Sequence, residues 1–244
     1  MNTFSWALLL ALALKVSCET ILGLRNINRI RKHKNQVPPE FEKVISSENH
    51  LHASNYNIHK IKSSLAFGLV ENTVFLLWVF GGNINRLDLW LGSVFQSEFA
   101  QGVAVIFSFG FISSLFAIPE TLYATFIIEE KYGFNRTTGK TWLSDLFKSM
   151  LLSIVLGLPI ISSILWIMKL FSTGWWIAAF VLVMSYQLVL FFVYPWLIAP
   201  LFNKFTPLTD PDLISRITDL GKRTGFFFKN IMVMDASRRS GHSN

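Results

Sequence analysis

Five long apolar stretches dominate this sequence and restrict the folds open to it. A helix needs about 20 apolar residues to cross the roughly 30 Å hydrocarbon core of a bilayer. Hydrophobic residues make up 52% of the 244 residues, and charged residues only 15%. The sequence therefore predicts an all-α multi-pass membrane protein with about five transmembrane helices, near Phe4–Leu24, Leu65–Gly82, Phe99–Pro119, Met150–Phe171 and Trp175–Ile198.

The basic residues fall between these stretches in an alternating pattern. Lys and Arg number eight in residues 25–62, one before the third stretch, four in residues 131–148, one before the fifth and seven after it. Cytoplasmic loops of membrane proteins carry the excess of Lys and Arg. We therefore predict an N-terminus outside and a cytoplasmic tail. The net charge of +7 comes without an aromatic–basic recognition motif, so the expected partner is the lipid bilayer and not nucleic acid.

Three ionisable residues lie inside the predicted spans, where charge is costly. Lys15 and Glu19 are four residues apart, so they either pair with each other or face a polar interior. Glu71 either faces such an interior or extends its carboxylate toward the membrane surface. A signal peptide is the competing interpretation of the first stretch, but its start, MNTFSW, has no basic residue, which favours an uncleaved span.

Metal-ligating patterns are weak in this sequence. The single cysteine, Cys18, excludes a disulfide and a cysteine-based zinc site within one chain. His50, His52 and His59 are close in sequence, but no carboxylate pattern or helical i, i+4 spacing accompanies them. We expect no metal site from these residues.

A charged loop follows the third stretch, with Glu129, Glu130, Lys131 and Asn135 around a turn at Gly133. Adjacent carboxylates could act as an acid–base pair, because like charges separate their pKa values. The alternative is a structural loop that clamps two helices through salt bridges. On physical grounds the structural role is favoured.

The tail after the fifth stretch predicts one amphipathic helix and one strand. Leu208–Thr224 carries candidate capping residues at its start and an apolar stripe, and Gly225 follows where the chain must turn. Ile231–Met234 has the composition of a strand. One helix and one strand cannot close a soluble core, so the tail is expected to need a partner that is missing here.

Three motifs carry a resemblance to a known family. They are TLYATFIIEEKYGFNRTT (residues 121–138), YPWLIAPLFNKFTPL (194–208) and MDASRRSGHSN (234–244), with a looser fit in residues 19–41. Together they resemble the type I CAAX prenyl proteases, which are integral-membrane zinc metallopeptidases. The resemblance implies seven membrane helices around a water-filled chamber and cleavage of the C-terminal CAAX motif of prenylated proteins. It also implies zinc held by an H-E-x-x-H helix and a later glutamate.

This chain departs from the family at the catalytic site. None of its histidines forms an H-E-x-x-H motif, so we assign no catalytic and no metal-binding residue. The expectation is an N-terminal fragment of a metalloendopeptidase, inactive alone, with zinc and the C-terminal peptidase region missing. Residues 1–198 would form the transmembrane domain, and residues 199–244 the truncated start of the peptidase domain, a cytoplasmic α+β region.

The last residues gain a role only through this resemblance. In the family this region leads into a strand beside the zinc cleft, so His242, Ser243 and Asn244 would lie at the substrate-binding rim. Arg238 or Arg239 would meet acidic groups on a partner or on the Glu129–Lys131 loop, or else form a solvated basic turn. Gly241 departs from the serine expected there.

One alternative of another class remains, a non-catalytic membrane scaffold or lipid-binding remnant of the same family. A small transporter is disfavoured, since no repeated pair of interrupted helices is present. The expected location is the endoplasmic reticulum membrane in a eukaryote or the inner membrane in a bacterium. The expected partner of the full-length protein is a prenylated protein or peptide.

Overall fold

The computed structural model describes residues 2–241, which are mostly helical. They divide into two compact units between Asn135 and Arg136. The predicted boundary at residue 198 separates the membrane spans from the start of a peptidase domain, and it stays a prediction. The predicted rim residues His242, Ser243 and Asn244 lie outside the described residues.

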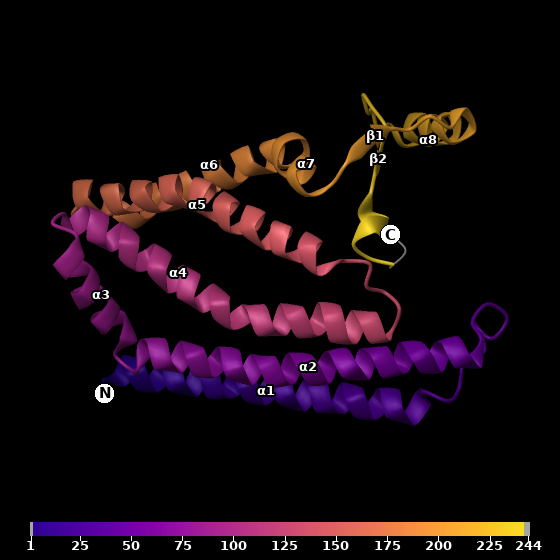
Figure 1. Cartoon of the computed structure of the whole chain (residues 1–244), viewed down its shortest axis with the longest axis horizontal. Coiled ribbons are helices and arrows are strands. Elements are labelled where there is room, and N and C mark those ends of the chain that lie inside the picture. The colour runs from indigo at the N-terminus through magenta and orange to yellow at the C-terminus, as the bar shows by residue number, and fades with distance from the viewer. Residues whose placement is uncertain (1, 242–244) are drawn as a thin grey trace. The chain divides into compact units, whose positions relative to one another are not determined.

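The first unit consists of four α-helices and a π-helical turn. They are α1 (Thr3–His33), α2 (Ser47–Val79), α3 (Asn83–Val94), α4 (Glu98–Tyr123) and η1 (Ala124–Glu129). Figure 1 shows α1 and α2 running side by side, and contacts between them confirm the pairing. Helix α2 also contacts α3, α4 and η1, so it is the central element of this unit.

The second unit begins with a helical pair and ends in a small α/β segment. Its elements are α5 (Gly139–Leu170), α6 (Trp175–Val193), η2 (Tyr194–Ile198), α7 (Ala199–Phe202), β1 (Phe205–Pro207), α8 (Pro211–Thr224), β2 (Met232–Met234) and η3 (Ala236–Arg238). Strands β1 and β2 pair antiparallel, with Phe205 opposite Met234 and Pro207 opposite Met232. The sequence predicted β2, one residue longer, but not its partner β1.

The apolar segments have the exposure of lipid-facing helices. Among the described residues, four helical segments are long and apolar enough to cross a membrane: Thr3–His33, Glu98–Glu129, Gly139–Leu170 and Trp175–Phe202. The predicted span Leu65–Gly82 differs, because α2 is long and apolar enough to cross a membrane only when it is taken together with α3, across a 57° bend. Side chains such as Phe191 (73% exposed) lie on the outside. This exposure is favourable in lipid, and the protein is an integral multi-pass membrane protein.

Local sequence explains where several of these elements begin and end. Thr138 caps α5, since its Oγ1 accepts a hydrogen bond from the amide of Thr141 at 3.2 Å. Asp210 caps α8 by accepting from the amides of Asp212 and Leu213. Gly225 ends α8 with a φ of 69°, a conformation that favours glycine. The predicted tail helix is thus confirmed, beginning three residues later than expected.

Candidate functional site

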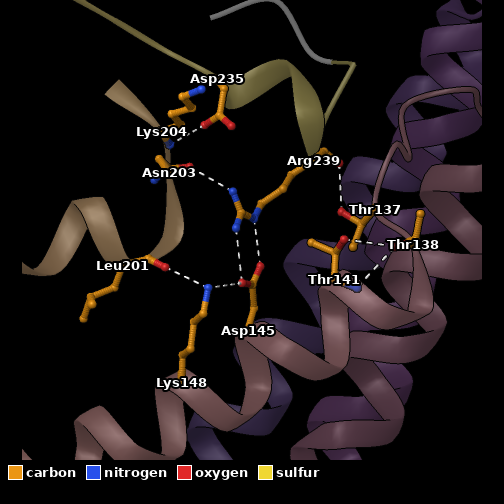
Figure 2. A network of polar contacts seen from close by, with 10 residues as sticks. All are labelled: Thr137, Thr138, Thr141, Asp145, Lys148, Leu201, Asn203, Lys204, Asp235 and Arg239. Atoms are coloured by element: carbon orange, nitrogen blue, oxygen red, sulfur yellow. Dashed lines mark hydrogen bonds and ion pairs between the residues drawn. The ribbon is translucent and has the colours of Figure 1, made fainter. Parts of the chain in front are cut away.

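A polar network in the second unit links segments that are far apart in sequence (Figure 2). Its centre is Arg239, which follows η3. The guanidinium donates to both carboxylate oxygens of Asp145, from Nε to Oδ2 at 2.8 Å and from Nη2 to Oδ1 at 3.1 Å. A third nitrogen, Nη1, donates to Oδ1 of Asn203 at 3.0 Å. One side chain therefore joins the first turns of α5 to the segment between α7 and β1.

The backbone of Arg239 adds a second set of contacts. Its carbonyl oxygen accepts hydrogen bonds from the amide of Arg136 at 3.2 Å and from Oγ1 of Thr137 at 3.0 Å. Both side chains of the Arg239–Asp145 pair are only 23% exposed, so solvent screens their attraction weakly. The hydrogen bonds to Asp145 raise the pKa of Arg239, and burial opposes this effect. The arrangement holds the chain just before residue 242 in one conformation.

Asp235 holds the same segment from its other side. Its Oδ1 accepts a hydrogen bond from the amide of Lys204 at 2.7 Å, and its own amide donates to the carbonyl of Lys204 at 3.1 Å. These bonds continue the β1–β2 pairing by one step. From the sequence we expected Arg238 or Arg239 to meet acidic groups on a partner or in the Glu129–Lys131 loop, or else to form a solvated basic turn. Arg239 instead pairs with an acidic side chain of its own unit and is only 23% exposed, so the solvated turn is wrong for Arg239. The partner is Asp145, two turns into α5, and no sequence periodicity links residues 94 positions apart.

The loop residues singled out from the sequence lie in an aromatic cluster of the first unit. Tyr56, in the polar part of α2 that precedes its apolar segment, donates a hydrogen bond from Oη to Oε1 of Glu129 at 2.6 Å. Glu130 accepts from Nδ2 of Asn135 at 2.8 Å across the turn at Gly133, whose φ is 75°. Each of the two carboxylates thus accepts a hydrogen bond from a different side chain. Glu129 joins two helices through a hydrogen bond to tyrosine, and the salt bridges expected from the sequence stay a prediction.

Tyr132 completes this cluster. Its ring packs edge-on against Tyr56, and its Oη lies 3.0 Å from Nδ1 of His59. The Nζ of Lys131 lies 5.9 Å from the centre of the same ring, and His52 also packs against it. Burial raises the pKa of Tyr132. Two of the three histidines considered as metal ligands therefore act as packing residues around one tyrosine.

A pocket of about 570 Å³ lies between α1 and α2 within the apolar part of the first unit. Lys15 pairs with Glu19 at 3.9 Å, and its Nζ lies 3.4 Å from Oδ1 of the buried Asn72. Glu71 and Glu120 also line this pocket. Both interpretations of Lys15 hold at once, since it pairs with Glu19 and faces a pocket. Glu120 was missed, although its place directly after Pro119 at the end of a predicted span was visible in the sequence.

The described residues contain no group of three or more His, Cys, Asp or Glu side chains placed to hold a metal ion. The Arg239 network can order chain segments, and the pocket beside Lys15 can bind a charged group.

Comparison with known proteins gives a consistent result. Residues 26–204 match a family model described as the CAAX prenyl protease N-terminal region with five membrane helices. The chain is 32% identical to CAAX prenyl protease 1 of Saccharomyces cerevisiae, over 93% of this chain and 52% of that protein. It is also 32% identical to the human CAAX prenyl protease 1 homolog, over 99% of this chain and 50% of that protein. The chain spans about half the length of these relatives.

A solved structure shares the fold. The crystal structure of S. mikatae Ste24p superimposes with a TM-score of 0.85 at 33% sequence identity, covering 96% of this chain and 56% of that one. The similarity therefore includes the segment after the last apolar helix as well as the spans.

Proposed function

Because this chain belongs to the CAAX prenyl protease family, we propose that it forms the N-terminal membrane region of a zinc metalloendopeptidase that processes the CAAX motifs of prenylated proteins. The observation that carries the proposal is the fold, which nearly the whole chain shares with a longer solved structure. In this proposal residues 1–198 are the transmembrane domain, and residues 199–244 begin the peptidase domain.

The residues of this chain do not fit a zinc site. The 244 residues contain no H-E-x-x-H motif, and residues 2–241 bring no three potential ligands together. A hydrolytic zinc ion needs about three protein ligands and an open position for water. We therefore assign no step of peptide hydrolysis to these residues and propose that the chain is inactive by itself. Zinc would be held by residues outside it.

The proposed contribution of this chain is positioning. Arg239 and Asp235 hold residues 235–241 against the start of α5 and the end of α7. We propose that the next residues, His242, Ser243 and Asn244, belong to the substrate-binding rim. A rim that binds an extended peptide needs a segment held in a fixed position, because backbone pairing depends on register. The pocket beside Lys15 and Asn72 would form part of a polar membrane interior.

The membrane orientation extends the same proposal. An outside N-terminus and a cytoplasmic tail would place the prenylated substrate and residues 199–244 on the same side. The location would be the endoplasmic reticulum membrane in a eukaryotic host and the inner membrane in a bacterial one. The alternation of basic residues between the spans supports this orientation.

A chimeric protein tests the function. Replacing the matching half of the yeast CAAX prenyl protease 1 with residues 1–244 should give an enzyme that cleaves a farnesylated CAAX peptide, with activity abolished by a zinc chelator. The matched control carries Glu→Gln in the H-E-x-x-H motif of the yeast half. A chimera that inserts in the membrane and folds, yet cleaves no better than this control, would favour the non-catalytic scaffold instead.

A further inference from the structure

A second pocket, of about 640 Å³, lies in the second unit beside the Arg239 network. It is lined by the start of α5 and the loop before it, by α7 and the residues after it, and by η3 and Arg239. Six basic side chains line it: Arg136, Lys140, Lys148, Lys204, Arg238 and Arg239. Asp145 is the single acidic residue in this lining. The pocket is therefore strongly positive.

Most of this positive charge is not neutralised by the protein. Asp145 is already engaged by Arg239 at 2.8 Å, with Lys148 at 4.0 Å. Among residues 2–241, no carboxylate lies within 4.0 Å of a charged nitrogen of the four other basic residues of the lining. Like charges gathered in a concave site repel one another, and a bound anion relieves this repulsion. The lining thus selects for negative charge.

The pocket also lies where two apolar helices end. Lys148 comes two residues before the predicted span that starts at Met150, and its Nζ donates to the carbonyl of Leu201 at 2.8 Å. Pro200, Leu201 and Phe202 follow the apolar segment that ends at Ile198 and supply an apolar part of the lining. One part of the pocket is thus basic and another apolar. Lipid headgroups meet a membrane protein where its apolar spans give way to basic residues.

We propose that this pocket binds the phosphate headgroup of an anionic phospholipid. The phosphate contacts Arg136, Lys140 and Lys204, and the glycerol and upper acyl carbons contact Leu201 and Phe202. Arg239 has a structural role, because its nitrogens donate hydrogen bonds to Asp145 and Asn203 and hold the lining of the pocket together. A free phosphate ion shares the first set of contacts but gains nothing from the apolar ones. The inference does not depend on proteolytic function.

Lipid binding by the purified chain in detergent tests this inference. Binding of phosphatidic acid and of phosphatidylcholine is measured by native mass spectrometry for the wild type and for R136Q/K140Q/K204Q. Each basic residue at an anionic lipid surface contributes about a 5-fold gain in affinity, so the triple variant should bind phosphatidic acid about 100-fold more weakly. The matched control K222Q/R223Q/K229Q removes three charges from the α8 region of the same unit and should bind within 2-fold of the wild type.

Two further measurements separate the remaining explanations. The charge-preserving variant R136K/K140R/K204R should retain binding, which would show that loss in the glutamine variant is electrostatic and not misfolding. Equal losses in the pocket variant and the α8 control would overturn the inference, because the attraction would then be diffuse. Inorganic phosphate that displaces phosphatidic acid at equal concentration would also overturn it, by showing that the site takes free phosphate without a lipid.

Discussion

The Arg239–Asp145 pair predicts a measurable loss of order when its charge is removed. Asp145→Asn keeps the size of the side chain but removes the charge and one of the two acceptors that the guanidinium uses. A hydrogen bond to a charged group contributes about 1.5 to 3 kcal/mol, so we expect a loss of about 2 kcal/mol. That loss makes local opening of residues 235–241 about 30-fold more frequent.

Hydrogen exchange in detergent measures this opening directly. The amides of Lys204 and Asp235 report it, because each donates a hydrogen bond that holds the segment. Their exchange should accelerate about 30-fold in Asp145→Asn, since exchange follows the open population. Arg239→Gln should have a similar effect, and the double variant should be little worse than either single variant, because both lose the same interaction.

The matched control is Asp212→Asn in α8. Asp212 pairs with Arg216 at 3.1 Å, but these side chains are 75% and 76% exposed. An exposed pair contributes about 0 to 1 kcal/mol, so exchange at Lys204 and Asp235 should not change. Equal exchange rates in Asp145→Asn and in this control, or additive effects of the two network substitutions, would refute the role given to Arg239.

Three further predictions concern the aromatic cluster and its turn. Tyr56→Phe removes the donor to Glu129 and should lower the free energy of unfolding by about 1.5 to 3 kcal/mol, measured as a drop in the thermal midpoint in detergent. Gly133→Ala should cost about 1 to 2 kcal/mol, since φ is 75° there, whereas Gly110→Ala, in a helix with open space around it, should not destabilise the protein. Burial, followed by two nearby lysines, lowers the pKa of His59. The folded state therefore favours the neutral imidazole, so the stability that His59 contributes is fully present above about pH 6.5 and is lost as the pH falls below that value. The drop in thermal midpoint between pH 7.5 and 5.5 should therefore be smaller in His59→Gln, and an equal drop would contradict this assignment.

The spans and the tail helix could be predicted because their signals are local. A run of apolar residues is visible whatever it packs against, and Asp210 and Gly225 mark the ends of α8 by their own chemistry. The bend at the end of α2 was not predicted. Gly81 and Gly82 were visible, but the second span was drawn straight to Gly82, whereas α2 ends at Val79 and α3 turns away by 57°.

The network and the second strand could not be predicted because their determinants are distant in sequence. Strand β1 has three residues and ends in proline, which is too short for an alternating pattern. Asp145 has no local feature that distinguishes it from any exposed acidic residue near a helix start. Its partner is identified only after α5, α6 and β2 have been placed, so the sequence did not single out Asp145 as the carboxylate that pairs with Arg239.

The long separation within the network has a consequence for biosynthesis. The hydrogen bond from Thr137 to the carbonyl of Arg239 joins residues that are 102 positions apart in the chain. At about 5 to 20 residues per second, translation of that interval takes roughly 5 to 20 seconds. During this time α5 and α6 emerge, while Asp145 is present without Arg239. Closure of the network is therefore a late event in synthesis, because Asp145 meets the guanidinium of Arg239 only after the last apolar helix has been made.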